Sequence, residues 1–182
     1  MTEFDWHAER GDLPELAQLD RDPSVEDVDL VAVRGYRLAR VREQMSLLGV
    51  DAVILSDPVN IRYATGARNM QVFSMRNAPS RYLLLTHDRS IIYEFTGCLH
   101  LPSGLETIDE IRPARTASFV AKGPHIEAFE RQWAKDMSNE IVNLVGPNPT
   151  VGLERLNAGA AIELNAHGIK VVDAQYAVEM AR

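Results

Sequence analysis

The sequence predicts a mixed α/β domain in which helices cover a sheet of parallel and antiparallel strands. Short apolar runs such as Ala52–Ser56 and Tyr82–Thr86 have the length and composition of buried strands. A long segment after Pro124 repeats apolar residues every three or four positions, which is typical of an amphipathic helix. The last third of the chain alternates strand, helix and strand, as in a parallel βαβ unit. We therefore expect antiparallel strands at one side of the sheet and parallel strands at the other.

Composition restricts the class of protein. A chain of 182 residues with 46% hydrophobic and 25% charged residues is long enough for one well-buried soluble domain. The net charge of −7 disfavours nucleic acid and anionic membranes as partners, because both require a basic surface. The single cysteine, Cys98, excludes an internal disulfide and a cysteine-rich zinc site. With no apolar run near the length of a membrane span and no secretory signal, the sequence predicts a cytoplasmic protein.

The first part of the chain predicts an arm and a helix. Residues 1–29 are acidic and contain Pro14 and Pro23, so we expect an arm that packs on a neighbouring subunit or forms a loosely ordered leader. Asp29 is a suitable N-cap, and Gly49 a suitable stop, for a helix with one apolar face. That face carries Leu38, Val41, Met45 and Leu48. We expect the arginines mostly off it to form a solvated face rather than an anion site; they are Arg34, Arg37, Arg40 and Arg42.

The sheet is predicted from the remaining runs. Strand Ala52–Ser56 ends at Asp57-Pro58, and a long excursion leads to strand Tyr82–Thr86, which forms a hairpin with Ile91–Phe95. The further elements are expected to be a helical turn and a strand near Glu110–Arg112, a helix from Pro124 to Gly146, a strand at Thr150–Glu154, a helix at Ala158–Ala166, a strand at Ile169–Asp173 and a further segment at 174–182.

The excursion between the first two strands carries the chemistry-bearing residues. Guanidinium groups hold carboxylates and aromatic rings accept cations, so this stretch can bind a carboxylate together with an apolar or cationic group. Alternatively, its tyrosines lie in the core, and its arginines cap loop carbonyls or meet acidic neighbours. The residues concerned are Tyr63, Arg68, Phe73, Arg76, Arg81 and Tyr82.

Other candidate sites are weaker. None of the five histidines forms a convincing ligand pair. Glu163 and His167 lie four residues apart on a predicted helix, but two groups do not make a metal site, and His167 suits the negative end of that helix. Cys98 lies two residues from His100, yet nothing in the sequence lowers the thiol pKa or orients a base, so we expect an inert thiol.

Several segments resemble a known family. The pattern DAVILSDPVNIRYATG, followed by SRYLLLT, IIYEF, EIRPAR, VGLE and VVDA, is similar to the N-terminal domain of the creatinase/prolidase/Xaa-Pro aminopeptidase (M24 metallopeptidase) superfamily. The resemblance covers about residues 30–182, and NIRYATG is its most specific part. It implies a ribonuclease-H-like mixed sheet flanked by helices. The segment DPVNIRYATGARNMQ also resembles the branch that contains a dimethylsulfoniopropionate lyase.

The resemblance implies that catalysis occurs outside these residues. In the family a C-terminal pita-bread domain binds two divalent metal ions (Mn, Zn, Fe or Co), and that domain is absent from this chain. We therefore expect no metal site or catalytic residue here, an inactive chain when alone, and a homodimeric parent protein. The implied role is substrate gating and subunit assembly in an Xaa-Pro peptidase or creatinase-like hydrolase. The alternatives are the same role in a dimethylsulfoniopropionate-lyase-like member, or a stand-alone protein-interaction module.

The resemblance also implies a substrate-binding loop. In creatinase-like members a loop of this domain reaches the active site of the adjacent subunit, where an aromatic residue and an arginine hold the substrate carboxylate. The corresponding candidates are Phe73, Arg76 and Arg81, whose spacing does not select one arginine.

Overall fold

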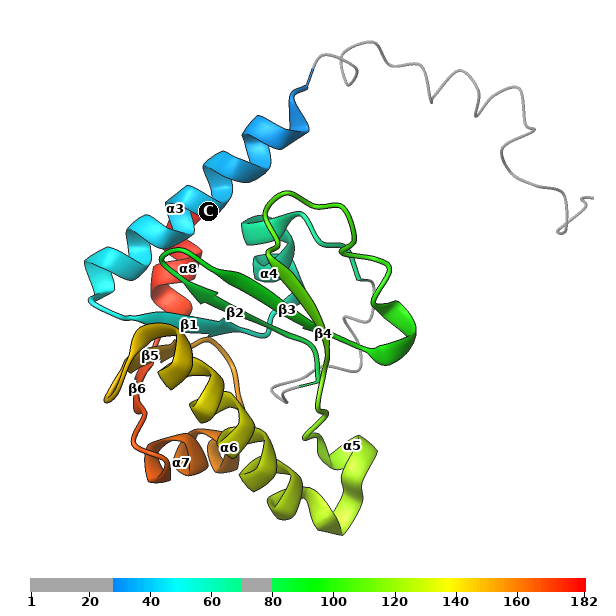
Figure 1. Ribbon diagram of the computed structural model, residues 1–182, viewed down its shortest axis with the longest axis vertical. Coiled ribbons are helices and arrows are strands. Elements are labelled where there is room, and N and C mark those ends of the chain that lie inside the picture. Colours follow the sequence, from blue (N-terminus) through cyan, green and yellow to red (C-terminus); the bar gives the residue numbers. More distant parts are fainter. Residues whose placement is uncertain (1–27, 70–79) are drawn as a thin grey trace, which may run out of the picture. The chain divides into compact units, whose positions relative to one another are not determined.

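The computed structural model describes residues 28–69 and 80–182 (Figure 1). The chain divides into two units, Met1–Leu30 and Val31–Arg182, and the elements below belong to the second unit apart from the first residue of helix α3. The predicted arm lies outside the described residues except for its last two positions, so its packing stays a prediction.

Six strands of this part of the chain form one mixed sheet in the order β4-β3-β2-β1-β5-β6. The strands are β1 (Ala52–Leu55), β2 (Tyr82–Thr86), β3 (Ser90–Glu94), β4 (Glu110–Pro113), β5 (Thr150–Leu153) and β6 (Lys170–Asp173). Central strand β1 pairs antiparallel with β2 and parallel with β5. The predicted mixed sheet is thus confirmed, with strand bounds within a residue or two of those expected.

The predicted division of the sheet into an antiparallel and a parallel side is wrong in one respect. The antiparallel pairs β1–β2 and β2–β3 lie in the interior, whereas edge strand β4 pairs parallel with β3. The segment between β3 and β4 is long enough for a crossover, and a crossover returns the chain in the same direction. Both edges of the sheet are therefore parallel.

Helices cover both faces of the sheet (Figure 1). They are α3 (Leu30–Leu48), α4 (Pro58–Thr65), α5 (Phe119–Lys122), α6 (Ile126–Val145), α7 (Ala158–Ala166) and α8 (Gln175–Ala181), with 3₁₀ turns η2 (Thr96–Cys98) and η3 (Gly123–His125). Helices α3, α4 and α8 pack on one face, and α6 and α7 on the other. None of the described helices combines the length and apolar character that a membrane span requires.

Alternation along the strands sends side chains into two separate cores. Val53 and Leu55 of β1 pack in the cluster that contains Val41 of α3, while Ile54 packs in the cluster that contains Trp133 of α6. All four residues of β1 are buried, so the strand has no solvated face. Burying each such side chain stabilises the fold by about 1.5–3 kcal/mol before chain entropy is subtracted.

The excursion after β1 begins with a helix that the sequence pattern did not reveal. Asp57 is the N-cap of α4 and its Oδ1 accepts a hydrogen bond from the Val59 backbone N–H at 2.8 Å. Pro58 occupies the first turn, where a missing N–H costs nothing. Gly66 ends the helix in the left-handed conformation, with φ of 81°. Asp57-Pro58, read as a breaker pair, therefore starts a helix instead of a loop.

The expected solvated arginine face on α3 is wrong for three of its four members. Arg34 pairs with Glu106 at 2.7 Å, and the Arg42 Nε donates to the Thr86 carbonyl at 3.1 Å. Arg40 donates to the last carbonyls of α8. Only Arg37 is exposed, with its guanidinium 5.6 Å from the centre of the Tyr63 ring. The arginines join α3 to its neighbours because long side chains reach past the helix boundary.

The close approach of β5 to the start of α8 gives a direct test of packing. A Cβ at Gly152 would lie 2.6 Å from the Ala174 Cβ and 3.1 Å from Val53 Cγ1. We expect Gly152→Ala to lower the free energy of unfolding by about 1–3 kcal/mol, because the Ala174 Cβ is fixed to the backbone and cannot rotate away. Gly97→Ala, which meets open space, is the control, and urea denaturation is the measurement. Equal effects from the two substitutions would contradict this packing.

Candidate functional site

Of the predicted substrate-binding residues, the structure describes only Arg81. Phe73 and Arg76 lie outside the described residues, so their roles stay predictions. Arg81 immediately precedes β2, and its side chain is completely buried. Because Tyr82 faces the α6 core, alternation directs Arg81 to the opposite face of the sheet.

Arg81 pairs with a residue that the sequence reasoning missed. The Arg81 Nε donates to Glu94 Oε2 at 2.6 Å, and neither side chain is exposed. The β2–β3 register places Tyr82 opposite Tyr93, so Arg81 and Glu94 face each other one step further along. The predicted hairpin bounds did not give this register: they would pair Thr86 with Ile91, whereas the structure pairs Leu85 with Ser90. Removing one partner of a buried ion pair lowers the free energy of unfolding of the protein by about 3–5 kcal/mol.

The two terminal nitrogens of Arg81 are unusual. Nη1 and Nη2 are buried, and neither has a hydrogen-bond partner among the described residues. A buried donor without an acceptor costs about 1–3 kcal/mol, and more when it is charged. An external acceptor, either a water molecule or a bound anion, would remove that cost. The guanidinium edge formed by Nη1 and Nη2 has the geometry that a carboxylate accepts with two oxygens.

The motif that carries the family resemblance forms a polar junction with α8. The Asn60 Nδ2 donates to Glu154 Oε1 and to Glu179 Oε1, the second bond at 3.3 Å. Its Oδ1 accepts from Arg182 Nη1 at 3.1 Å. The Tyr63 hydroxyl donates to the Ala181 carbonyl. Asn60 and Tyr63 thus join α4 to α8.

Glu154 completes this junction at the end of β5. Its Oε2 accepts from the backbone N–H groups of Ser56 at 2.8 Å and Asp57 at 2.7 Å. Burial raises the pKa of the Glu154 carboxyl above its ordinary value, while the hydrogen bond from Asn60 opposes that shift. The carboxylate therefore fixes the turn between β1 and α4. The sequence analysis assigned Glu154 only to a strand.

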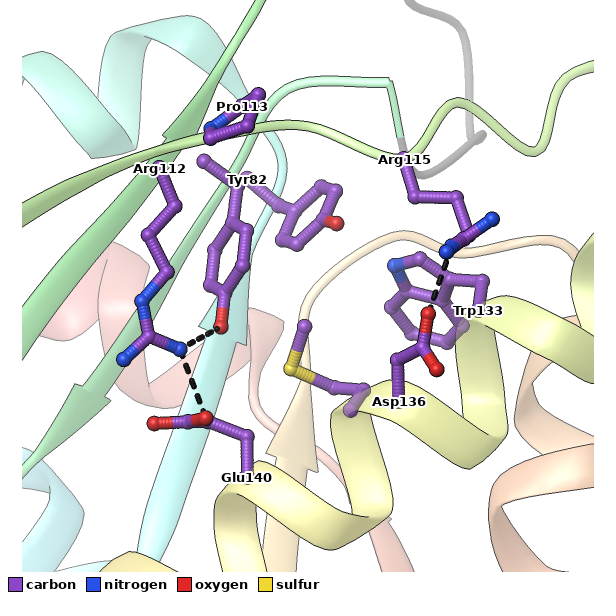
Figure 2. Close-up of a pocket in the computed structure, with 9 residues that line it drawn as sticks. Tyr82, Arg112, Pro113, Arg115, Trp133, Asp136 and Glu140 are labelled. Atoms are coloured by element: carbon purple, nitrogen blue, oxygen red, sulfur yellow. Dashed lines mark hydrogen bonds and ion pairs between the residues drawn. The ribbon is translucent and has the colours of Figure 1, made fainter.

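A pocket of about 200 Å³ lies on the opposite face of the sheet, between β4 and α6. Figure 2 shows its aromatic interior beside two ion pairs, Arg112–Glu140 and Arg115–Asp136, each 2.7 Å long. The rings of Tyr82 and Tyr93 stack at 4.7 Å, and Tyr82 meets Trp133 edge to face at 5.8 Å. Both arginines are paired with carboxylates, so the pocket presents no free cation. It contains none of the three predicted substrate-binding residues Phe73, Arg76 and Arg81, and Tyr82 is its one residue from the excursion. The alternative prediction that Tyr82 belongs to the core is confirmed.

The remaining sequence candidates form no active centre among the described residues. Glu163 pairs with Arg131 at 3.5 Å, and His167 occupies the C-cap of α7. Cys98 is a partly exposed free thiol in η2, and no hydrogen bond joins its side chain to His100. Residues 28–69 and 80–182 contain no group of three His, Cys, Asp or Glu side chains that could hold a metal ion. The described residues do not fit a two-metal centre, so no catalytic step is assigned to them.

The six-stranded mixed sheet, its helices and the α4–α8 junction define the fold class, and comparison with known proteins gives the family. The sequence model described as "Creatinase/Prolidase N-terminal domain" matches residues 37–182. The chain belongs to this family, and hence to the M24 superfamily.

Two curated relatives are dimethylsulfoniopropionate lyases named DddP. The protein from Roseobacter denitrificans is 25% identical over 98% of this chain and 37% of its own length. The protein from Roseovarius nubinhibens is 23% identical over 85% of this chain and 34% of its own length. The chain thus spans little more than a third of either relative.

Solved structures share the fold. The N-terminal domain of the cytoplasmic peptidase PepQ from Mycobacterium tuberculosis H37Rv has a TM-score of 0.55 at 19% identity, covering 80% of this chain and 98% of that domain. The dipeptidase PepE from Mycobacterium ulcerans has a TM-score of 0.54 at 17% identity, covering 84% of this chain and 37% of that protein.

The α4–α8 junction can be tested by removing its central amide. We expect Asn60→Ala to lower the free energy of unfolding by about 1–3 kcal/mol, because it removes a donor from the buried Glu154 carboxylate. The control is Asn165→Ala, whose exposed amide bonds only within α7, and which should change stability by less than about 0.5 kcal/mol. Chemical denaturation measures both. An Asn60→Ala protein as stable as the parent would show that the junction contributes nothing.

The aromatic pocket predicts an alkaline sensitivity. Burial raises the pKa of Tyr93 to about 12 and also raises the pKa of Tyr82. Between about pH 10, where an unfolded tyrosine ionises, and pH 12, only the unfolded state loses the Tyr93 proton, so stability falls as pH rises. Melting temperature measured across this range should fall less steeply for Tyr93→Phe than for the parent protein. Exposed Tyr176→Phe is the control and should leave the slope unchanged. A Tyr93→Phe slope equal to that of the parent would refute the assignment.

Proposed function

We propose that this chain is the non-catalytic N-terminal domain of a metal-dependent Xaa-Pro peptidase or creatinase-like hydrolase, and that it contributes to substrate gating and subunit assembly. Family membership supports the domain assignment. The observation that carries a role in recognition is the buried Arg81 guanidinium, which is fixed at Nε and whose two terminal nitrogens have no partner in the part of the chain that the structure describes. These nitrogens supply binding energy for an anion, and the described residues contain no group of three side chains that could hold a metal ion.

The proposed ligand group is a carboxylate. Dimethylsulfoniopropionate, creatine and an Xaa-Pro dipeptide all carry one, so the same guanidinium serves each of these substrate classes. We assign this carboxylate to Arg81, and keep Phe73 and Arg76 as further substrate-binding residues on the basis of the family resemblance alone.

The whole protein is proposed to contain more than this chain. Its partners are its own C-terminal catalytic domain, which holds the two divalent metal ions, and a second subunit in a cytoplasmic homodimer. The support is that the chain spans 37% and 34% of its two curated relatives, while the family domain accounts for most of the chain.

A second candidate is a dimethylsulfoniopropionate-lyase-like enzyme, and one observation favours it. Similarity to the Roseobacter denitrificans lyase extends over 98% of the chain, which includes residues before position 37, where the family match begins. The third candidate is a stand-alone protein-interaction module, which predicts that no metal-binding residues are encoded after residue 182. The coding sequence after residue 182 separates the module from the enzymes. Assays of the complete protein with dimethylsulfoniopropionate, creatine and Xaa-Pro peptides then separate the two enzyme classes.

The recognition role predicts a specific kinetic defect. In the complete protein, Arg81→Lys keeps the positive charge beside Glu94 but loses the paired nitrogens. We expect KM to rise by about 10- to 150-fold, which corresponds to about 1.5–3 kcal/mol for a hydrogen bond to a charged group, with a much smaller change in kcat. Arg115→Lys, in a half-exposed ion pair, is the control and should leave KM unchanged. A folded Arg81→Lys enzyme with the parent KM would overturn the proposal.

A further inference from the structure

The Glu94 carboxylate is saturated with donors. Its Oε2 accepts from Arg81 Nε at 2.6 Å, and its Oε1 accepts from Asn69 Nδ2 at 2.8 Å and from the Phe95 backbone N–H at 3.1 Å. The side chain has no exposed surface. Three donors from three parts of the chain hold the carboxylate in one orientation, because any rotation breaks at least one bond inside the core.

This arrangement also determines how Arg81 is held. A carboxylate that meets an arginine side-on accepts hydrogen bonds from two of its nitrogens. Glu94 accepts only from Nε, because its other oxygen accepts from the Asn69 amide and the Phe95 backbone N–H. The guanidinium is planar, so fixing Nε in a packed core restricts the direction of the whole group. Nη1 and Nη2 are left as a pair of donors with no partner in the described chain.

We propose that Glu94 is the positioning residue of the carboxylate site: it anchors Arg81 through Nε so that Nη1 and Nη2 stay available to a substrate carboxylate. The inference rests on the proposed function of Arg81 and adds the residue that sets its geometry. Glu94 also joins two separate segments, because Asn69 and Arg81 lie on either side of residues 70–79 in the sequence. Glu94 does not touch the substrate, so its effect passes through Arg81.

The electrostatics agree with a positioning role. Glu94 balances the buried charge of Arg81, which lowers the cost of burying the guanidinium. Its own charge is stabilised by the Asn69 amide and the Phe95 N–H, so it does not need the other nitrogens of the guanidinium. A neutral residue at position 94 would leave Arg81 without a partner. The guanidinium would then turn toward another acceptor or toward solvent.

The test measures binding of propionate and of its neutral isostere propionamide to the complete protein by NMR titration. The parent protein should bind propionate more tightly, and Arg81→Lys should reduce that preference at least tenfold. Glu94→Gln should reduce it at least tenfold as well, whereas Glu94→Asp, which keeps the charge, should retain part of it. The control is Glu110→Gln, at a partly exposed pair with Arg112, and it should leave the preference unchanged. Circular dichroism checks that each variant is folded.

The outcomes separate the two proposals. If the parent binds both probes equally, or if folded Arg81→Lys keeps the preference, the proposed function fails and the inference fails with it. If Arg81→Lys loses the preference while Glu94→Gln and Glu94→Asp keep it fully, Arg81 binds the carboxylate but Glu94 does not position it. If Glu94→Gln does not fold, Glu94→Asp decides: an unchanged preference overturns the positioning role, and a partial loss supports it.

Discussion

Burial of both faces of the central strands is the constraint on which the rest of the structure depends. Strand β1 lies between β2 and β5, and its alternate side chains enter two different cores. Where such a strand ends in the interior, its backbone groups need hydrogen-bond partners within the protein, and Ser56 at the end of β1 is buried. Glu154 meets that requirement by accepting from Ser56 and Asp57, where β1 gives way to α4. The polar junction is therefore a consequence of the sheet, and the family motif is located where the sheet requires it.

The same constraint explains why the buried ion pair lies where it does. Arg81 and Glu94 occupy the open end of the β2–β3 hairpin, one step beyond the last stacked aromatic pair, Tyr82 and Tyr93. Alternation gives the two pairs opposite faces, so the aromatic residues complete the α6 core while the charges enter the other side. An apolar pair at the charged position would also fill the space. Because burying two charges costs free energy that an apolar pair would not cost, packing alone does not explain this ion pair.

Much of this fold follows from periodicity. The strands and the long helices are predicted within a residue or two, because their burial is regular and dominates their composition. Helix α4 was missed because Asp57-Pro58 starts a helix as readily as it ends a strand, and only the capping geometry decides between them. The arginines of α3 were misjudged because the partners of a long side chain, such as the carbonyls of α8, are set by tertiary contacts. Glu94 was missed because the predicted hairpin bounds did not set the register, and only the observed pairing of Tyr82 with Tyr93 places Glu94 opposite Arg81.

The proposed division between recognition and chemistry limits what this domain contributes to a reaction. A carboxylate held by Arg81 does not change its charge while a distant bond is cleaved, so this contact binds the ground state and the transition state about equally. Uniform binding lowers KM without raising kcat. The contact raises kcat only if anchoring the carboxylate also aligns the reacting bond with the metal centre. A rigid anchor serves alignment better than a mobile one, and the three hydrogen bonds to Glu94 make Arg81 rigid.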